Sequence, residues 1–278
     1  MKRPGWVNVD FIVGFSLLGL VVGGVILGPL LWPVDPYHQS IAHVFQPPLE
    51  SGEHGNLYPL GSDQLGRDLL ARIIAGTRTS LVIVTLAMLI AAPLGVAGGV
   101  LAGLFGRWTD ATIMRLVDIQ LAIPFILLVM MIVAVLGSGM ANLIIVLGIT
   151  GWAVYARVAR GQVLSIKNLE YIEAAQALGS SRLRLILRHI LPNIMTPLIV
   201  LVTLDLPRLV ILESAMGFLG LGVQPPTPTL GNLLGEGQAY IFTSWWLVVF
   251  PGTVIAMLVV AFNLIGDWLV QVTNARIE

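Results

Sequence analysis

Long uncharged apolar runs, separated by short stretches that carry the charges, dominate the pattern of this chain. The first run covers residues 11–34, which is enough to cross about 30 Å of hydrocarbon at roughly 1.5 Å per residue. The run at 119–156 is long enough for two spans, which we expect to fold back at Gly137-Ser138-Gly139. Similar runs lie at 79–106, at about 193–217 and at 237–266. The pattern therefore predicts an all-α, polytopic membrane protein with six transmembrane helices.

Six spans put both termini on one side of the membrane, and the basic residues predict which side that is. Eleven Lys and Arg residues fall on the side of the N-terminus and three on the other, so the positive-inside rule places both termini in the cytoplasm. We expect a cytoplasmic N-terminus at 1–10, a transmembrane domain at 11–270 and a cytoplasmic C-terminus at 271–278. Within the domain, an outer segment occupies about 33–77 and a cytoplasmic loop about 161–192. The eleven are Lys2, Arg3, Arg107, Arg115, Arg157, Arg160, Lys167, Arg182, Arg184, Arg188 and Arg276, and the three are Arg67, Arg72 and Arg78.

The composition agrees with a membrane protein and excludes several other classes. Hydrophobic residues make up 56% of the 278-residue chain, charged residues only 11%, and the mean hydropathy is +0.90, which excludes a soluble globular domain. A net charge of zero gives no electrostatic footprint for nucleic acid. Without cysteine the chain has no disulfide, thiolate zinc site, iron–sulfur cluster or cysteine nucleophile.

The cytoplasmic loop is expected to form two short helices. Asn168 can cap the first, Gly179 can end it after Leu178, and a face of small and apolar residues lets another protein approach closely. A second helix can start from Ser180 or Ser181 and stop at Pro192. A surface hairpin that only connects two spans remains the alternative. The face of the first helix consists of Tyr171, Ala175 and Leu178, with Ala174 beside them.

Small residues at intervals of four in the second apolar run predict a close helix contact. Gly95, Gly99 and Gly103 have the spacing that lets membrane helices approach each other. The sequence leaves open whether the neighbour belongs to this chain or to a partner.

The outer segment contains a glycine-rich motif at 61–68. Its glycine spacing imitates a phosphate-binding loop, but Arg-Asp follows where Lys-Ser/Thr is needed, so we expect no nucleotide site and no enzyme activity in this chain. Two interpretations stay open, a tight turn with an Asp63 or Arg67 ion pair and direct contact with substrate. The motif residues are Gly61, Asp63, Gly66, Arg67 and Asp68.

Three histidines of the outer segment, near two glutamates, raise the question of a metal site. Imidazole and carboxylate together can bind nickel, but their spacing in a loop with Pro and Gly does not form a site in advance. We expect a solvated loop and no metal. The residues are His38, His43, His54, Glu50 and Glu53.

Several separated motifs resemble one family of transporters. A Glu-Ala-Ala triplet, a glycine and a terminal Leu-Pro recur at this spacing in the cytoplasmic loop of bacterial binding-protein-dependent ABC importer permeases, although His189 stands where isoleucine is usual. The stretches at 60–68 and 218–226 are similar to the C-type permease of the dipeptide, oligopeptide and nickel importers. The resemblance covers about residues 11–267. The loop residues that carry it are Glu173, Ala174, Ala175, Gly179, Leu191 and Pro192.

The resemblance implies an assembly in a bacterial inner membrane. Its expected parts are a second homologous permease, two cytoplasmic ATPases that bind ATP and Mg, and an extracytoplasmic solute-binding protein. The helix around 173–179 is then expected to dock on an ATPase and transmit its closure to the spans. Peptides are the expected substrate, with nickel, metal chelates or glutathione as alternatives within the same architecture.

The fifth span carries three charges that lipid alone would not accommodate. Asp205 and Arg208 are three residues apart and can pair on one helical face. Glu213 is left over, and we expect it either to line the path of the substrate or to pair with the second permease. A relay of these charges in an ion-coupled secondary transporter is the alternative from a different functional class.

Overall fold

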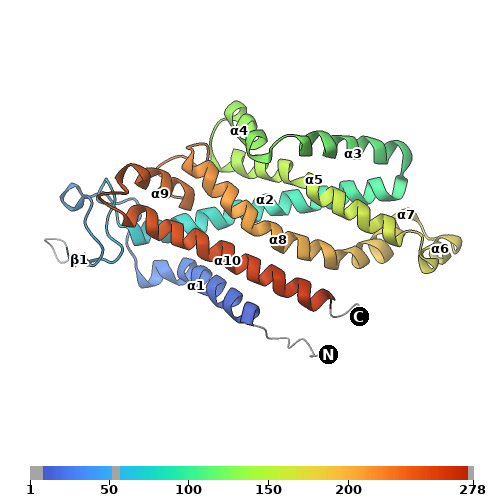
Figure 1. Ribbon diagram of the computed structural model, residues 1–278, viewed down its shortest axis with the longest axis horizontal. Helices are drawn as coiled ribbons and strands as arrows, with labels where there is room; N and C mark the ends of the chain where they lie inside the picture. The colour runs from blue at the N-terminus through green and yellow to red at the C-terminus, as the bar shows by residue number, and fades with distance from the viewer. Residues whose placement is uncertain (1–8, 52–56, 275–278) are drawn as a thin grey trace.

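The computed structural model describes residues 9–51 and 57–274. Five long helices run roughly along the longest axis of the molecule (Figure 1). They are α1 (Val9–Leu31), α2 (Leu69–Phe105), α5 (Met140–Ile166), α8 (Leu191–Phe218) and α10 (Trp246–Asn274). The only strands in the described ranges are β1 (Glu50–Ser51) and β2 (Leu57–Tyr58), which pair antiparallel with Glu50 opposite Tyr58. The predicted all-α class is confirmed.

The sixth span differs from the prediction. In the described part of the chain five helices are long and apolar enough to cross a membrane, and the sixth is a pair, α3 (Arg107–Ala122) and α4 (Phe125–Leu136), bent by 93°. The predicted fold at Gly137–Gly139 is present, and a further break lies at Ile123-Pro124, where the proline interrupts the apolar run. Ile123 adopts extended geometry because the proline ring disfavours a helical conformation in the residue before it.

Other helix boundaries also depart from the uncharged runs. Helix α2 begins at Leu69 rather than at 79, because the Asp68 carboxylate accepts a hydrogen bond from the Ala71 amide at 2.7 Å and caps it there. Its 37 residues span about 55 Å, so its charged first turns lie beyond the hydrocarbon. Helix α10 begins at Trp246 rather than at 237, because α9 (Leu230–Gly237) and the 3₁₀ turn η3 (Gln238–Tyr240) precede it.

The glycines of α2 pack against α5 of the same chain. A Cβ at Gly95 would overlap the Trp152 carbonyl oxygen, and one at Gly99 would overlap the Ala156 carbonyl oxygen. A Cβ at Gly103 would lie only 2.7 Å from the Val163 Cβ atom. Only glycine permits backbones this close, so the predicted contact is confirmed and its partner is α5.

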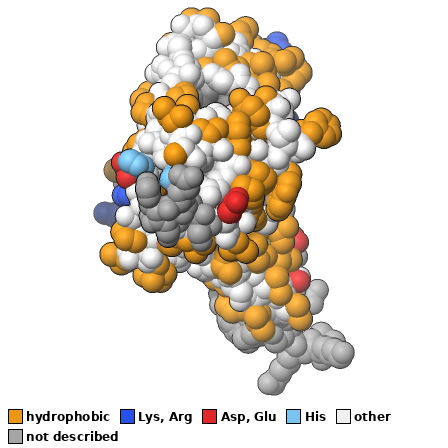
Figure 2. Space-filling model, turned by 90° about the vertical axis from the view of Figure 1, so that its left-hand side faces the viewer, with side chains coloured by type: hydrophobic (Ala, Val, Ile, Leu, Met, Phe, Trp, Pro, Cys, Tyr) orange, Lys and Arg blue, Asp and Glu red, His pale blue; other side chains and the backbone are white. Residues whose placement is uncertain are grey.

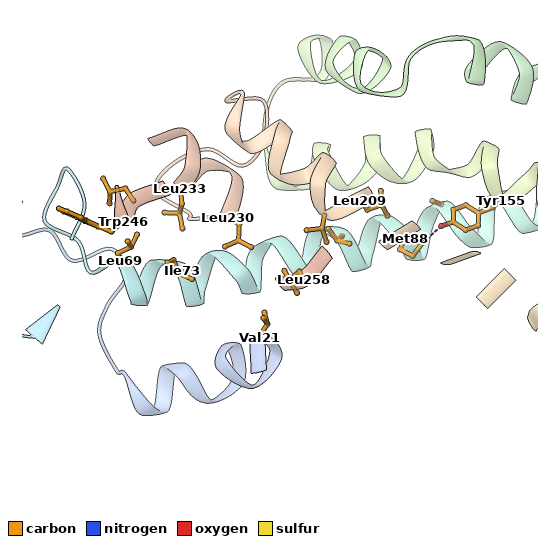
Figure 3. Packing of buried hydrophobic residues seen from close by; sticks show 14 residues of the cluster. Val21, Leu69, Ile73, Met88, Tyr155, Leu209, Leu230, Leu233, Trp246 and Leu258 are labelled. Atoms are coloured by element: carbon orange, nitrogen blue, oxygen red, sulfur yellow. Dashed lines mark hydrogen bonds between the residues drawn. The ribbon is translucent and has the colours of Figure 1, made fainter. Parts of the chain in front are cut away.

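A buried apolar cluster extends along α2 from the end that carries the outer segment. Figure 3 shows Leu69 and Ile73 of α2 beside Leu230 and Leu233 of α9, with Trp246 of α10 to their left. Farther along, Met88 lies against Tyr155 of α5, whose hydroxyl oxygen is 3.0 Å from the Met88 sulfur. The cluster joins α2, α5, α8, α9 and α10 into one bundle.

The outside of the bundle is largely apolar. Figure 2 views the end that carries the outer segment and shows hydrophobic side chains over much of the flanks, with few charged ones among them. Leu30, Leu89 and Val135 are among the exposed residues. Such a surface is stable against lipid or a partner protein and not against water.

Candidate functional site

The loop predicted at 161–192 lies at the same end of the bundle as both termini (Figure 1). Its helix α6 runs over Glu170–Ala177, and the amide of Ser180 donates to the Ala175 carbonyl oxygen at 3.1 Å. Gly179 has a φ of +81°, which this helix-ending motif requires and which glycine adopts without strain. The predicted end of the helix at Gly179 is therefore confirmed, while its start lies at Glu170.

Helix α6 is held from one side and open on the other. The Ile172 side chain is fully buried among Val163, Leu185 and Ile190, and Ala175 lies partly buried against the same cluster. On the other side, Tyr171 is partly exposed while its hydroxyl accepts a hydrogen bond from Asn193 Nδ2 at 3.2 Å, and Leu178, just after the helix, is 88% exposed. The predicted face is therefore corrected, because Ala175 turns inward. The open surface consists of Glu170, Tyr171, Glu173, Ala174, Ala177 and Leu178.

Two contacts attach the loop to the end of α2. The Lys167 ammonium donates to the Gly103 carbonyl oxygen at 3.1 Å, and the Arg182 guanidinium lies 5.1 Å from the centre of the Phe105 ring. Both neighbours belong to the last turn of α2, which packs along α5. A displacement of the loop would therefore reach the two closely packed helices directly.

Pro192 does not end the second helix of the loop, contrary to the prediction. Helix α7 (Arg182–Leu185) starts with a Ser181 cap and continues through the wider turn η2 (Ile186–Ile190) into α8. Pro192 is the second residue of α8 and follows the π-helical turn η2 directly. Leu191 and Pro192 thus connect the loop to a membrane helix without a break.

The motif at 61–68 forms a buried ionic cluster. The Asp63 Oδ2 atom accepts hydrogen bonds from Arg67 Nε at 2.7 Å and from Arg72 Nη1 at 2.5 Å. Glu236 of α9 accepts from Arg67 Nη2 at 2.9 Å and from Arg72 Nη1 at 2.8 Å. The predicted turn with an Asp63–Arg67 ion pair is confirmed, and burial of both side chains removes them from contact with substrate in this structure.

Arg72 and Glu236 were not predicted as members of this cluster. Glu236 lies far from the motif in sequence, and Arg72 lies on the helix that follows the motif. No spacing rule links either residue to Asp63. Burial alone would raise the pKa of Glu236, but the hydrogen bonds and charges of Arg72 and Arg67 outweigh it and hold that pKa below its usual value. Burial raises the pKa of Asp68, the cap of α2, despite its hydrogen bonds to backbone amides.

The glycines of the motif shape the turn that holds the cluster. Gly61 and Gly66 have φ values of +84° and +70°, and a Cβ at Gly66 would overlap the Ser40 carbonyl oxygen. The backbone of the outer segment therefore lies directly on the turn. Trp246 supports it from α10 by donating its indole N–H to the Ser62 carbonyl oxygen at 3.1 Å.

The histidines of the outer segment do not converge in the described ranges. His38 is exposed, whereas His43 is buried with its Nδ1 atom 2.7 Å from the Ser40 hydroxyl. That burial corrects the expectation of a uniformly solvated loop. Among the residues that the structure describes, no three His, Asp or Glu side chains gather as metal ligands would. Glu53 and His54 lie outside the described residues.

The predicted ion pair in the fifth span is present. Arg208 Nη1 donates to Asp205 Oδ1 at 3.1 Å, and the Tyr155 hydroxyl donates to Asp205 Oδ2 at 2.9 Å. The Arg208 guanidinium also lies 4.4 Å from the centre of the Phe125 ring. A buried carboxylate thus holds a partly exposed cation on the face of α8 that meets α4 and α5.

Glu213 is fully buried within the chain, which corrects both predictions for it. Lining a path or pairing with a second subunit needs an accessible side chain, whereas the Glu213 carboxylate is enclosed with the hydroxyls of Ser80 and Ser214 of the same chain. Helix α9 packs across α8 here, where a Cβ at Gly231 would overlap the Ser214 carbonyl oxygen. The sequence did not predict α9, and so it did not predict that α9 packs over α8 beside Glu213.

Comparisons of the chain with known proteins agree on one family. A family model described as "Binding-protein-dependent transport system inner membrane component" matches residues 95–278. The di/tripeptide transport system permease protein DppC of Pseudomonas aeruginosa is 40% identical over 273 residues, which cover 98% of this chain and 89% of that protein. The glutathione transport system permease protein GsiD of Pectobacterium atrosepticum is 37% identical over 219 residues, which cover 79% of this chain and 73% of that protein.

A solved structure supports the fold. The chain resembles inward-facing conformations of the MetNI methionine ABC transporter with a TM-score of 0.57 and 22% sequence identity. The match covers 72% of this chain and 95% of that one. At this identity the likeness concerns the arrangement of the helices only.

Proposed function

The chain belongs to the family of binding-protein-dependent transport system inner membrane components, and from this membership we propose that it forms half of a membrane path for peptides. The other half is a second, homologous permease. An extracytoplasmic binding protein delivers the peptide, and two cytoplasmic ATPases supply the energy by hydrolysing ATP with Mg. The family membership argues against an ion-coupled secondary transporter, which needs no such partners.

The proposed contact with the ATPases rests on helix α6. Ile172 anchors it, and its outer face is open, with Glu173, Ala174 and Leu178 exposed. The adjoining Arg182 and Lys167 contact the last turn of α2, so that a force on α6 reaches α2 and α5. In the proposed mechanism an ATPase binds this face, and its closure moves the helices that it contacts.

Peptides are proposed as the substrate because relatives named as di/tripeptide and dipeptide permeases match nearly the whole chain. The glutathione-system relative makes glutathione, itself a tripeptide, the second candidate. A comparison of uptake between a dipeptide and glutathione, presented by the cognate binding protein, separates the two.

The test of this function is a substitution on α6 that does not disturb this chain. Ala174 is exposed, so Ala174→Trp adds bulk without a clash inside the subunit. We expect the complex to insert and the ATPases to hydrolyse ATP, while peptide uptake in proteoliposomes falls roughly tenfold or more, because several interface contacts are lost. Uptake and ATP hydrolysis are measured on the same preparation.

Ala111→Trp is the matched control, because Ala111 of α3 is also exposed but lies outside the loop. It is expected to keep normal uptake. Normal uptake by Ala174→Trp would reject α6 as the coupling element and leave the loop as a connector between spans.

A further inference from the structure

Arg208 stands out because a permanently charged side chain lies deep in a membrane helix and remains accessible. It precedes the end of α8 at Phe218 by ten residues, which is about 15 Å along the axis and near the middle of a bilayer about 30 Å thick. The side chain is 39% exposed, whereas that of its partner Asp205 is 10% exposed. The exposed part of the pair is therefore the cation.

The neighbours of Arg208 fix one edge of its guanidinium and leave the other open. Within the described residues its only hydrogen bond runs from Nη1 to Asp205 Oδ1 at 3.1 Å, and Asp205 is itself held by Tyr155 at 2.9 Å. The ring of Phe125 supports the guanidinium at 4.4 Å. The edge formed by Nε and Nη2 keeps its donors free, in the planar arrangement that binds a carboxylate through two hydrogen bonds.

A second observation indicates that this surface does not face lipid. Phe125 is the first residue of α4, directly after the 93° break, and the neighbouring Ile123 is exposed with extended backbone geometry. Irregular backbone at membrane depth occurs only where protein covers it or where it lines a water-filled cavity. Arg208 and the break therefore belong to one non-lipid surface of the subunit.

With the proposed function as its premise, we propose that Arg208 binds the C-terminal carboxylate of the peptide during its passage. Every linear peptide with a free C-terminus carries this group at neutral pH, so the contact serves peptides of different side chains equally. Arginine stays protonated under all physiological conditions. Asp205 and Phe125 act as positioning residues, and the Asp205 charge offsets that of Arg208 so that the bound carboxylate can leave again.

The test compares a dipeptide with its C-terminal amide in the complete transporter. The wild-type complex, reconstituted in proteoliposomes with its binding protein, is given each compound at a concentration that saturates that protein. We expect faster uptake of the free acid. Arg208→Gln should lower uptake of the acid roughly tenfold or more, as for loss of a charged hydrogen bond, and leave uptake of the amide unchanged.

Two further variants complete the comparison. Arg208→Lys keeps the charge but not the planar pair of donors, so its ratio of acid to amide uptake should lie between wild type and Arg208→Gln. Arg157→Gln removes an exposed arginine of α5 that pairs with Asp118 of α3 and should keep the wild-type ratio.

Equal losses of acid and amide uptake in Arg208→Gln would overturn the inference and assign Arg208 a structural role. If Arg208→Gln does not co-purify with the other subunits, Arg208→Lys decides, because a wild-type ratio there overturns the inference and a lower ratio supports it. A wild-type complex that takes up neither compound would instead reject the proposed function, and this inference with it.

Discussion

The carboxylate of Glu236 helps to join the outer segment to the bundle. It accepts hydrogen bonds from Arg67, Arg72 and Gln64, with its own side chain 21% exposed. Removal of one member of a buried ionic cluster leaves charge without compensation, which typically costs about 3–5 kcal/mol when the pair is fully buried. Because Glu236 is partly exposed, solvent screening reduces that cost here.

Glu236 makes the stability of the protein depend on pH in a defined direction. Its pKa is lower in the folded protein than the ordinary value of about 4.3, so its contribution is present above the ordinary pKa. That contribution is lost as the pH falls through the lower, folded-state value. We expect Glu236→Gln to lower the Tm in detergent near neutral pH, and the difference from wild type to shrink on acidification below about pH 4.

Glu170→Gln is the control for this measurement, because Glu170 is exposed on α6 and has no ion pair within the described residues. It should differ little from wild type at any pH. A Tm difference for Glu236→Gln that is the same at neutral and acidic pH would contradict the assignment.

Among the elements, the pairing of α2 with α5 depends on glycine. Gly99→Ala should destabilise the protein by roughly 1–3 kcal/mol, because the added Cβ would overlap the Ala156 carbonyl oxygen and force the helices apart. The matched control is Gly24→Ala in α1, where a Cβ meets no atom within 4 Å. Thermal unfolding in detergent measures both variants. Equal Tm values for the two would show that the close approach contributes nothing to stability.

The helices were predictable from sequence where an uncharged apolar run has nearly the same bounds as the helix. Helix α1 and the close contact at Gly95 and Gly99 follow from run length and glycine spacing alone. The start of α2 was missed because Arg72 and Arg78 both lie inside the helix, and the charge of Arg78 marked an apparent boundary. In fact Arg72 is neutralised by Asp63 and Glu236, a long-range pairing that a one-dimensional pattern does not contain.

The candidate sites were predictable to a similar degree. Residues that interact locally, such as Asp205 with Arg208 and Asp63 with Arg67, follow from helical or turn spacing. The environment of Glu213 does not, because the short helix α9 that lies across α8 has only eight residues and its apolar positions merge with the neighbouring run. The 93° bend before Phe125 does not follow from the sequence either, since uncharged sequence continues on both sides of Pro124.

At the scale of the whole molecule, the two ends of the bundle differ. The outer segment and α9 lie at one end, and α6, α7 and both termini lie at the other (Figure 1). The predicted cytoplasmic side carries eleven basic residues and the opposite side three. Since basic residues near membrane helices are retained in the cytoplasm, this asymmetry predicts that the α6 end faces the ATPases.

Labelling of single cysteines tests this orientation directly, because the chain contains none of its own. Ala42 is exposed in the outer segment and Ser165 is exposed near the end of α5. In spheroplasts washed free of binding protein, Ala42→Cys should react with a membrane-impermeant maleimide, and Ser165→Cys should react only after lysis. Leu147→Cys, at a fully buried position, should react in neither case and controls for unfolded protein. The reverse pattern would invert the subunit in the membrane and place α6 away from any cytoplasmic ATPase, so the proposed coupling would fail together with the orientation.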